Sequence, residues 1–213
     1  MGVQMITVFG GWPTRSHRVL WLLEELGLPY VFRQVDLRKR REDTEFLSVN
    51  PAGFLPAVRD GDTDLVESVA IMEYILAKNP STLRPSPDDP AFGSYLLFLH
   101  LGEAGLAALL NVVVVSRIFA PAAEKLNFGS EAAVGLFFNR LSLVSARLAS
   151  EPYLAGQNFT AADISVSYAL ELGERMGLKD RYESVLAEYM GRLSERAAYQ
   201  RALSKSPPHP LPS

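Results

Sequence analysis

Residues 50–58 read Asn50-Pro51-Ala52-Gly53-Phe54-Leu55-Pro56-Ala57-Val58, and this is the most specific segment of the chain. Its Asn-Pro pair favours the end of a helix, because the residue before a proline avoids helical dihedrals. Gly53 permits a turn closed to other residues, and Pro56 suits the start of a strand, since proline cannot donate to the ladder. A cis peptide bond between Leu55 and Pro56 would leave the Leu55 N–H and carbonyl free to pair with an extended peptide. An ordinary loop with two prolines is the alternative interpretation.

Upstream of this stretch the pattern predicts a strand, a helix and a second strand. Residues 5–9 are apolar and rich in strand formers. Residues 16–26 place apolar side chains at helical spacing, and Gly27 predicts the C-cap of that helix. Residues 30–37 read as the second strand. These pieces make a βαβ unit, whose two strands we expect to be parallel.

Downstream the pattern predicts a hairpin and another helix. Residues 44–49 form a predicted short helix directly before residues 50–58. Two short strands, 57–59 and 64–66, flank Asp60-Gly61-Asp62, and Asp-Gly between apolar runs is a hairpin signal. A further helix begins at Ser68 and ends near Asn79. The order βαβ-α-ββα predicts a mixed sheet with helices and excludes a doubly wound nucleotide-binding fold.

The remaining chain reads as helical. Residues 79–90 hold four prolines, a linker composition. Beyond them, strand signals fade, and we interpret the run Val112–Val115 as buried helix because no hairpin partner flanks it. The predicted helices are 92–119, 131–150, 161–176 and 181–203. The expected organisation is an α/β domain at 1–80, a linker at 81–90, an all-helical domain at 91–205 and a flexible tail at 206–213.

Composition excludes several classes of function. The 213 residues include no cysteine, so disulfides, thiolate metal sites and a protein thiol nucleophile are excluded. Lys and Arg number 21 against 24 Asp and Glu, so no broad basic surface indicates nucleic-acid binding. Three well-separated histidines give no metal-ligand spacing. The N-terminus lacks a signal-peptide pattern, and we read the apolar residues 95–115 as a core helix rather than a membrane span, so a cytoplasmic location is expected.

The second chemically informative segment is Leu65-Val66-Glu67-Ser68, where a strand becomes a helix. Ser68 is a good N-cap, and the N–H groups at that terminus attract a carboxylate. The Glu67 carboxylate accepts bonds from an ammonium group. Together they suit an amino-acid α-carbon that carries both charges; the alternative is that Ser68 only caps the helix.

Both segments, in this order and at this spacing, resemble the glutathione-binding half of cytosolic glutathione transferases. Residues 18–30 look like the first helix and second strand of bacterial members. Residues 156–164 resemble the family's capping motif, in which Thr160 and Asp163 have a structural role. The resemblance covers essentially the whole chain, and it implies an N-terminal thioredoxin-like domain followed by a C-terminal helical bundle domain.

The resemblance also implies residue roles. The backbone of Leu55, beside a cis Pro56, would pair with the cysteinyl part of glutathione, while Glu67 and Ser68 would hold the γ-glutamyl end. Phe54 stands where the family often has Lys or Gln for the glycyl carboxylate, and the nearby basic run 38–41 is a candidate substitute. The helical domain would supply an apolar pocket; candidate residues are Trp12, Tyr95, Leu99, Leu106, Leu110 and Phe119. Dimers are typical, so a homodimer is expected.

The group that activates the thiol departs from the family pattern. The family uses a Tyr, Ser or Cys after the first strand, and the matching position is Pro13, which has no donor. Thr14 is the leading candidate for the hydroxyl, Ser16 the second although it competes as the helix N-cap, and Arg15 offers charge instead. His17 is expected at the surface.

These observations favour a glutathione transferase that joins the glutathione thiolate to a hydrophobic electrophile. Glutathione is then a co-substrate, and neither a metal, a nucleic acid nor a membrane is expected as a partner. One alternative is another glutathione-dependent activity: peroxide reduction, ether cleavage or isomerisation. The other is a non-catalytic module that keeps the fold for binding or dimerisation, since fold alone does not imply function.

Overall fold

The computed structural model describes residues 5–206, which divide into two compact units. The first holds residues 5–81 and 194–206, and the second holds residues 82–193. The sequence assigned everything from 91 to 205 to the helical domain, whereas the last helix, α9 (Ala197–Lys205), groups with the first unit. The expected tail, apart from Ser206, lies outside the described residues.

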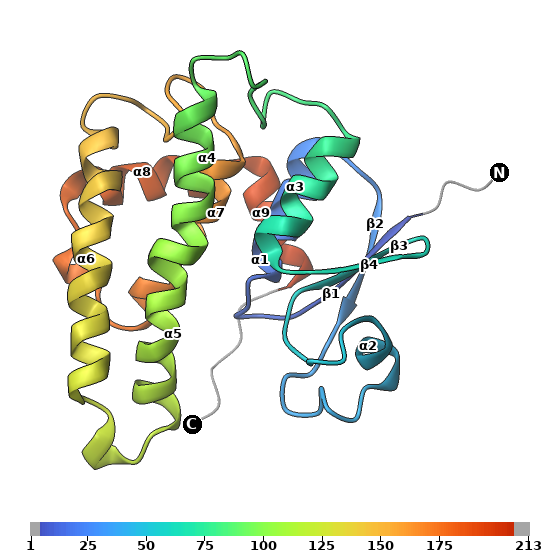
Figure 1. Ribbon diagram of the computed structural model, residues 1–213, viewed down its shortest axis with the longest axis horizontal. Helices are drawn as coiled ribbons and strands as arrows, with labels where there is room; N and C mark the ends of the chain where they lie inside the picture. The colour runs from blue at the N-terminus through green and yellow to red at the C-terminus, as the bar shows by residue number, and fades with distance from the viewer. Residues whose placement is uncertain (1–4, 207–213) are drawn as a thin grey trace. The chain divides into compact units, whose positions relative to one another are not determined.

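The first unit is built on a four-stranded mixed sheet (Figure 1). Its order is β2-β1-β3-β4, with β1 parallel to β2 and antiparallel to β3, and with β3 and β4 forming the predicted hairpin. The thioredoxin-like order βαβ-α-ββα is therefore confirmed. The strands are β1 (Ile6–Gly10), β2 (Tyr30–Gln34), β3 (Ala57–Asp60) and β4 (Thr63–Val66).

Helices cover both faces of this sheet. Helix α1 (Ser16–Leu26) and helix α3 (Ser68–Lys78) lie side by side on one face, and α2 (Thr44–Val49) lies on the other (Figure 1). Phe46 of α2 is fully buried and packs in one core cluster with Phe9 of β1. Gly27 ends α1 in the left-handed conformation that the sequence predicted.

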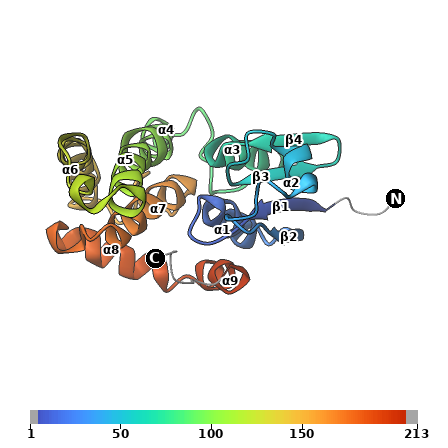
Figure 2. The same cartoon turned by 90° about the horizontal axis from the view of Figure 1, so that it is seen from below.

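Helix α9 lies beside α1 (Figure 2). Charged and aromatic side chains join the two helices. Arg196 reaches Glu25 at 2.6 Å, and Arg201 reaches Glu24 at 2.7 Å. The Tyr199 ring meets the His17 ring edge-on, with centroids 5.2 Å apart. His17 is buried, so its predicted surface position is wrong; residues far along the chain supply this cover, and the local pattern does not show them.

The second unit is a bundle of helices. The predicted helix 181–203 is two helices, α8 and α9, separated at residues 195–196. The predicted helix 92–119 is a single helical run that alternates α and π geometry. The elements are α4 (Phe92–His100), η1 (Leu101–Ala107), α5 (Ala108–Val114), η2 (Val115–Phe119), η3 (Ala122–Glu124), α6 (Phe128–Leu148), α7 (Ala161–Arg175), η4 (Lys179–Arg181) and α8 (Ser184–Ser194).

The long run Phe92–Phe119 is apolar and long enough to span a membrane by length and composition alone. In the structure its inner side chains, among them Leu99 and Leu110, are fully buried in the second unit. Val112–Val115 is helical as predicted, but Val112 and Val115 are exposed, so only part of the run is buried. The run is therefore a core helix of this unit with one outward face.

The capping motif at the start of α7 has its predicted structural role. Thr160 and Asp163 form a reciprocal capping box, and Asp163 also accepts from the Leu154 N–H at 3.0 Å. The Tyr189 hydroxyl donates to the same carboxylate at 2.8 Å. Burial raises the pKa of Asp163. The hydrogen bonds that its carboxylate accepts from the Leu154 and Thr160 N–H groups and from the Thr160 and Tyr189 hydroxyls oppose that shift. The motif links three segments of the second unit.

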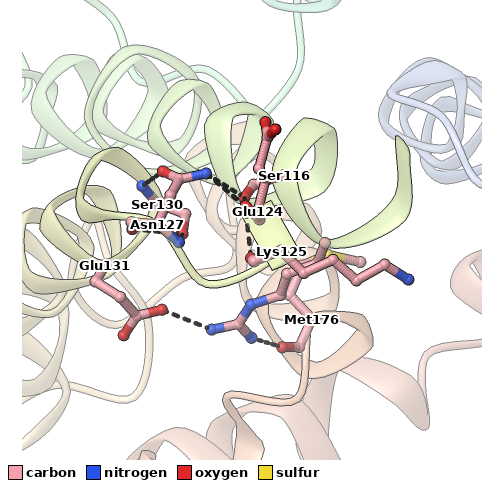
Figure 3. Close-up of polar contacts among 8 residues, drawn as sticks. Ser116, Glu124, Lys125, Asn127, Ser130, Glu131 and Met176 are labelled. Carbon is pink, nitrogen blue, oxygen red and sulfur yellow. Dashed lines mark hydrogen bonds and ion pairs between the residues drawn. The ribbon is translucent and has the colours of Figure 1, made fainter. Parts of the chain in front are cut away.

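A second polar network closes the connection between η2 and α6 (Figure 3). The Ser116 hydroxyl lies within hydrogen-bond distance of the Glu124 and Lys125 carbonyls. Asn127 donates to Ser116 Oγ at 2.8 Å and caps α6 through the Ser130 N–H at 3.0 Å. The residues of this loop are mostly exposed and bury little apolar surface, so side-chain hydrogen bonds hold its backbone.

Candidate functional site

Strand register brings the predicted site segments to one end of the sheet. Phe9 of β1 pairs with Ala57 of β3, and Ala57 pairs with Val66 of β4. The loop that follows β1, the Leu55–Pro56 pair that precedes β3 and the Glu67–Ser68 pair that follows β4 therefore leave the sheet at the same edge. Segments separated by more than fifty residues in the sequence thus lie together, as the sequence analysis anticipated.

The Leu55–Pro56 peptide bond is cis. Gly53 has φ +72°, the left-handed region that the sequence reserved for glycine. Asn50 holds the turn from both sides, because its Nδ2 donates to the Phe54 carbonyl at 2.7 Å and its Oδ1 accepts from the Ala52 N–H at 3.1 Å. Among residues 5–206, neither the N–H nor the carbonyl of Leu55 has a hydrogen-bond partner. Unpaired backbone groups of this kind are what an added extended peptide would pair with.

The corner between β4 and α3 differs from its prediction in one respect. Ser68 is the first residue of α3, and Glu67 occupies the N-cap position without a side-chain cap bond. Glu67 has φ +69°, a strained conformation for a side chain other than glycine, and it is exposed. The interpretation of Ser68 as N-cap is therefore wrong. Its hydroxyl faces another helix, and a pattern of local cap residues does not show such a contact.

The partner of Ser68 is Arg18, a residue that the sequence analysis did not select. Arg18 Nη1 donates to Ser68 Oγ at 3.1 Å, and both residues are buried, Arg18 completely. A sequence signal exists: Arg18 stands four residues before Leu22, so it shares the apolar face of α1. A charged side chain on a buried face needs a polar partner, and this requirement points to the site.

The loop between β1 and α1 holds both hydroxyl candidates. Thr14 Oγ1 donates to the Gly11 carbonyl at 2.6 Å and lies 2.8 Å from Ser16 Oγ. Ser16 Oγ also accepts from the Gly11 N–H at 3.1 Å. The expected N-cap role of Ser16 is wrong, because Ser16 is the first residue of α1 and Arg15 occupies the N-cap position without a side-chain cap bond. The Ser16 N–H donates to Thr14 Oγ1 at 3.3 Å. The Trp12–Pro13 bond in this loop is also cis, which the sequence analysis did not predict.

Solvent exposure distinguishes Thr14 from Ser16. Ser16 is 1% exposed, whereas Thr14 is only partly buried. A Cβ at Gly10 would lie 2.5 Å from the Ser16 Cβ, so glycine is required for β1 to approach α1 this closely. The structure thus holds Ser16 inside the loop and presents Thr14 nearer the surface.

Arginines surround the turn that carries Phe54. Phe54 is 41% exposed. Arg40 Nε donates to the Gly53 carbonyl at 3.0 Å, and Arg40 also donates to the Leu37 carbonyl. A Cβ at Gly53 would lie 3.1 Å from Arg41 Nη1, so the Arg41 guanidinium packs directly on the turn. The basic run predicted to lie near this segment does so.

The predicted pocket residues of the second unit are mostly core. Tyr95, Leu99, Leu106 and Leu110 are completely buried, whereas Phe119 is 70% exposed. Within the part of the chain that the structure describes, no group of three His, Asp or Glu side chains is placed to hold a metal ion. The four buried residues therefore do not line a pocket in this unit.

Known proteins are similar to this chain in sequence and in fold. The family described as "Glutathione S-transferase, N-terminal domain" matches residues 4–77. Glutathione S-transferase 3 of Zea mays is 31% identical over 217 residues, covering 92% of this chain and 91% of the maize protein. Glutathione S-transferase 3 of Schizosaccharomyces pombe is 29% identical over 208 residues, covering 90% and 84%.

A solved structure extends the likeness to three dimensions. The theta class glutathione S-transferase from the citrus canker pathogen Xanthomonas axonopodis pv. citri, determined with glutathione bound, gives a TM-score of 0.80 at 25% identity. The match covers 94% of this chain and 97% of that protein. Similar proteins thus come from a plant, a fungus and a bacterium, and the likeness is not confined to bacterial members.

Proposed function

The chain belongs to the cytosolic glutathione transferase superfamily, and from this premise we propose that it joins the thiolate of glutathione to a hydrophobic electrophile. The sulfur forms the new bond to carbon, and the leaving group departs with its electron pair. The observation that supports this proposal most is the convergence of the Leu55 backbone, Glu67–Ser68 and Thr14–Ser16 at one sheet edge. A similar protein that was solved with glutathione bound supports the same choice of ligand.

In this proposal the peptide part of glutathione is held by backbone. The open N–H and carbonyl of Leu55 pair with the cysteinyl residue as an added strand would. Glu67 accepts from the γ-glutamyl ammonium, and Ser68 with the first N–H groups of α3 binds the α-carboxylate. No acidic side chain occupies the first turn of α3, so no protein carboxylate competes there. Arg40 and Arg41 lie where a glycyl carboxylate would need cations, close to Phe54.

The chemical step requires an ionised thiol. A thiol with a pKa of about 8.5 is only a few per cent ionised at neutral pH, so a donor to sulfur raises the reactive fraction. We assign this donor to Thr14, whose hydroxyl is the more accessible of the two. The Thr14 hydroxyl donates a hydrogen bond to the Gly11 carbonyl at 2.6 Å. To donate to sulfur, it therefore has to exchange that acceptor for the thiolate. Ser16 remains the second candidate, and Arg15 supports the anion by charge.

The proposal extends to setting and partners. We propose a cytoplasmic homodimer with a role in detoxification, in which the helical unit supplies apolar surface for the second substrate. Holding both substrates together and stabilising the thiolate would supply the rate enhancement. Neither a metal nor a nucleic acid takes part in this scheme.

One observation favours a second candidate, a non-catalytic glutathione-binding module. Pro13 has no donor at the family's usual position, and the Thr14 hydroxyl already has a short bond inside its loop. Titration with glutathione followed by an assay with chlorodinitrobenzene separates the two. Binding with turnover supports the transferase, and binding without turnover of this or of peroxide substrates supports the module. Absence of binding at millimolar glutathione contradicts the whole proposal.

A further inference from the structure

We propose that Arg18 is a positioning residue for glutathione, which it serves by fixing the direction of the Ser68 hydroxyl proton. This inference rests on the proposed function and adds a residue to it. Arg18 does not touch the ligand in this account. It acts through Ser68, which then donates to the α-carboxylate of the γ-glutamyl group.

The contact between Arg18 and Ser68 has a fixed hydrogen-bond direction. Arg18 Nη1 and Ser68 Oγ are 3.1 Å apart, and a guanidinium only donates hydrogen bonds. Ser68 Oγ is therefore the acceptor in this pair, and its own proton must be directed elsewhere. Among residues 5–206 the structure shows no acceptor for that proton. A ligand carboxylate at this corner would receive it.

The Arg18–Ser68 pair is buried. Arg18 is completely buried and Ser68 is 1% exposed, so water does not reorient this pair freely. A hydroxyl rotor that is fixed before the ligand arrives loses less freedom on binding than a free one. The Arg18 side chain thus prepares the donor geometry that the carboxylate requires.

Electrostatics at the β4–α3 corner act in the same direction. The N-terminus of α3 carries a partial positive charge, which favours an anion beside Ser68. The Arg18 guanidinium stays protonated at every physiological pH, so it remains a donor to Ser68 Oγ. The corner therefore favours a carboxylate over a neutral group of the same shape. If Arg18 served only to join α1 to α3, its removal would not change the preference of the protein for a ligand with this carboxylate.

The test uses two ligands that differ only at this carboxylate: glutathione and 4-aminobutanoyl-cysteinylglycine, which lacks it. Affinities are measured calorimetrically for the intact wild-type chain and for Arg18→Met, Ser68→Ala and the double variant. Wild type is expected to prefer glutathione by at least about tenfold, the scale of one charge-assisted hydrogen bond. Arg18→Met is expected to remove most of this preference while binding the analogue as well as wild type does.

The double variant should lose no more preference than Ser68→Ala alone, because Arg18 acts through Ser68. Equal weakening of both ligands by Arg18→Met, or an unchanged preference, overturns the inference. If Arg18→Met does not fold, Ser68→Ala decides the matter: because Arg18 acts through Ser68, a preference in Ser68→Ala equal to that of wild type overturns the inference. Failure of wild type to bind glutathione contradicts the proposed function instead, so the two failures are distinguishable.

Discussion

The two ends of the candidate site hold their hydroxyl groups in different ways. At the β4–α3 corner, Ser68 receives one hydrogen bond from a cation on another helix, and its proton has no acceptor among residues 5–206. At the β1–α1 loop, Thr14 and Ser16 bond to each other and to Gly11. In the proposed function the first end binds the carboxylate of glutathione, and the second exchanges an internal acceptor for sulfur. Binding and activation would then depend on separate local structures.

The largest expected effect is on turnover and comes from the loop between β1 and α1. Thr14→Val keeps the shape of the side chain and removes the donor, so we expect the turnover rate to fall about 100-fold, the usual cost of one transition-state donor. Glutathione affinity should change less than about twofold, because Thr14 contributes to the reactive form rather than to binding. Steady-state kinetics with chlorodinitrobenzene at saturating glutathione measure both quantities.

Ser16→Ala is the matched comparison for that prediction. Ser16 is buried in the loop, so its loss should reduce turnover less than the loss of Thr14 does. A normal rate in Thr14→Val together with a large loss in Ser16→Ala would transfer the role to Ser16. Normal rates in both would leave the charge of Arg15.

The next largest effect is on glutathione affinity and comes from the binding end of the site, the β4–α3 corner with Glu67 and Ser68. Ser68→Ala should weaken glutathione binding about tenfold and lower the free energy of unfolding by about 1–3 kcal/mol, since a buried donor loses its acceptor. The stability cost does not come from a lost cap, because Glu67 holds the N-cap position. Calorimetric titration and chemical denaturation measure the two changes.

Ser167→Ala provides the control. Ser167 is equally buried and donates to the Ile164 carbonyl at 3.0 Å in the helical unit. It should lose stability while its glutathione affinity stays at the wild-type value. An unchanged affinity in Ser68→Ala would show that the site assignment is wrong.

A smaller effect separates stability from binding at one residue. Glu67 has φ +69°, so Glu67→Gly should relieve strain and raise the free energy of unfolding by about 1 kcal/mol, while glutathione binds several-fold more weakly. Glu67→Gln removes the charge without relieving the strain. It should therefore weaken binding with no gain in stability. A Glu67→Gly variant that is less stable than wild type would contradict the argument from strain.

The smallest effect concerns the support of the binding end. Asp60 in the hairpin accepts from Lys78 at 2.6 Å and from Tyr74 at 2.8 Å, and both donors lie on α3. The hydrogen bond from Lys78, chiefly, lowers the pKa of Asp60 below its usual value of 3.8. This contribution to stability is present above the unfolded pKa and is lost as the pH falls through the lower folded pKa.

Because Asp60 is partly solvated, we expect a contribution below about 1 kcal/mol. Unfolding free energies measured across the acid range should show the loss in wild type, and Asp60→Asn should lack it. An equal acid dependence in both proteins would assign the effect to other carboxylates.

Sequence reasoning worked where a signal is local. The bounds of α1 and α2, the left-handed Gly27 and Gly53, the Asp-Gly hairpin and the capping box at Thr160 each follow from residues within one or two turns. Register then places the site segments together, because residue order along the strands fixes which strand ends meet.

The contacts that could not be predicted from the sequence are long-range. Arg18 lies fifty residues from Ser68, and Tyr199 covers His17 from the far end of the chain. A single helix pattern cannot show which buried partner a charged side chain will find. The capping error at Ser16 has a different cause, since the helix begins one residue earlier than a Ser16 cap requires and the Ser16 hydroxyl bonds to Gly11 instead.

The most direct measurement is a crystal structure of the chain soaked with glutathione. The account predicts the α-carboxylate within hydrogen-bond reach of Ser68 Oγ, the cysteinyl backbone paired with Leu55, and the sulfur next to Thr14 Oγ1. Glutathione bound away from this sheet edge, or bound there with its γ-glutamyl end far from Ser68, would contradict it.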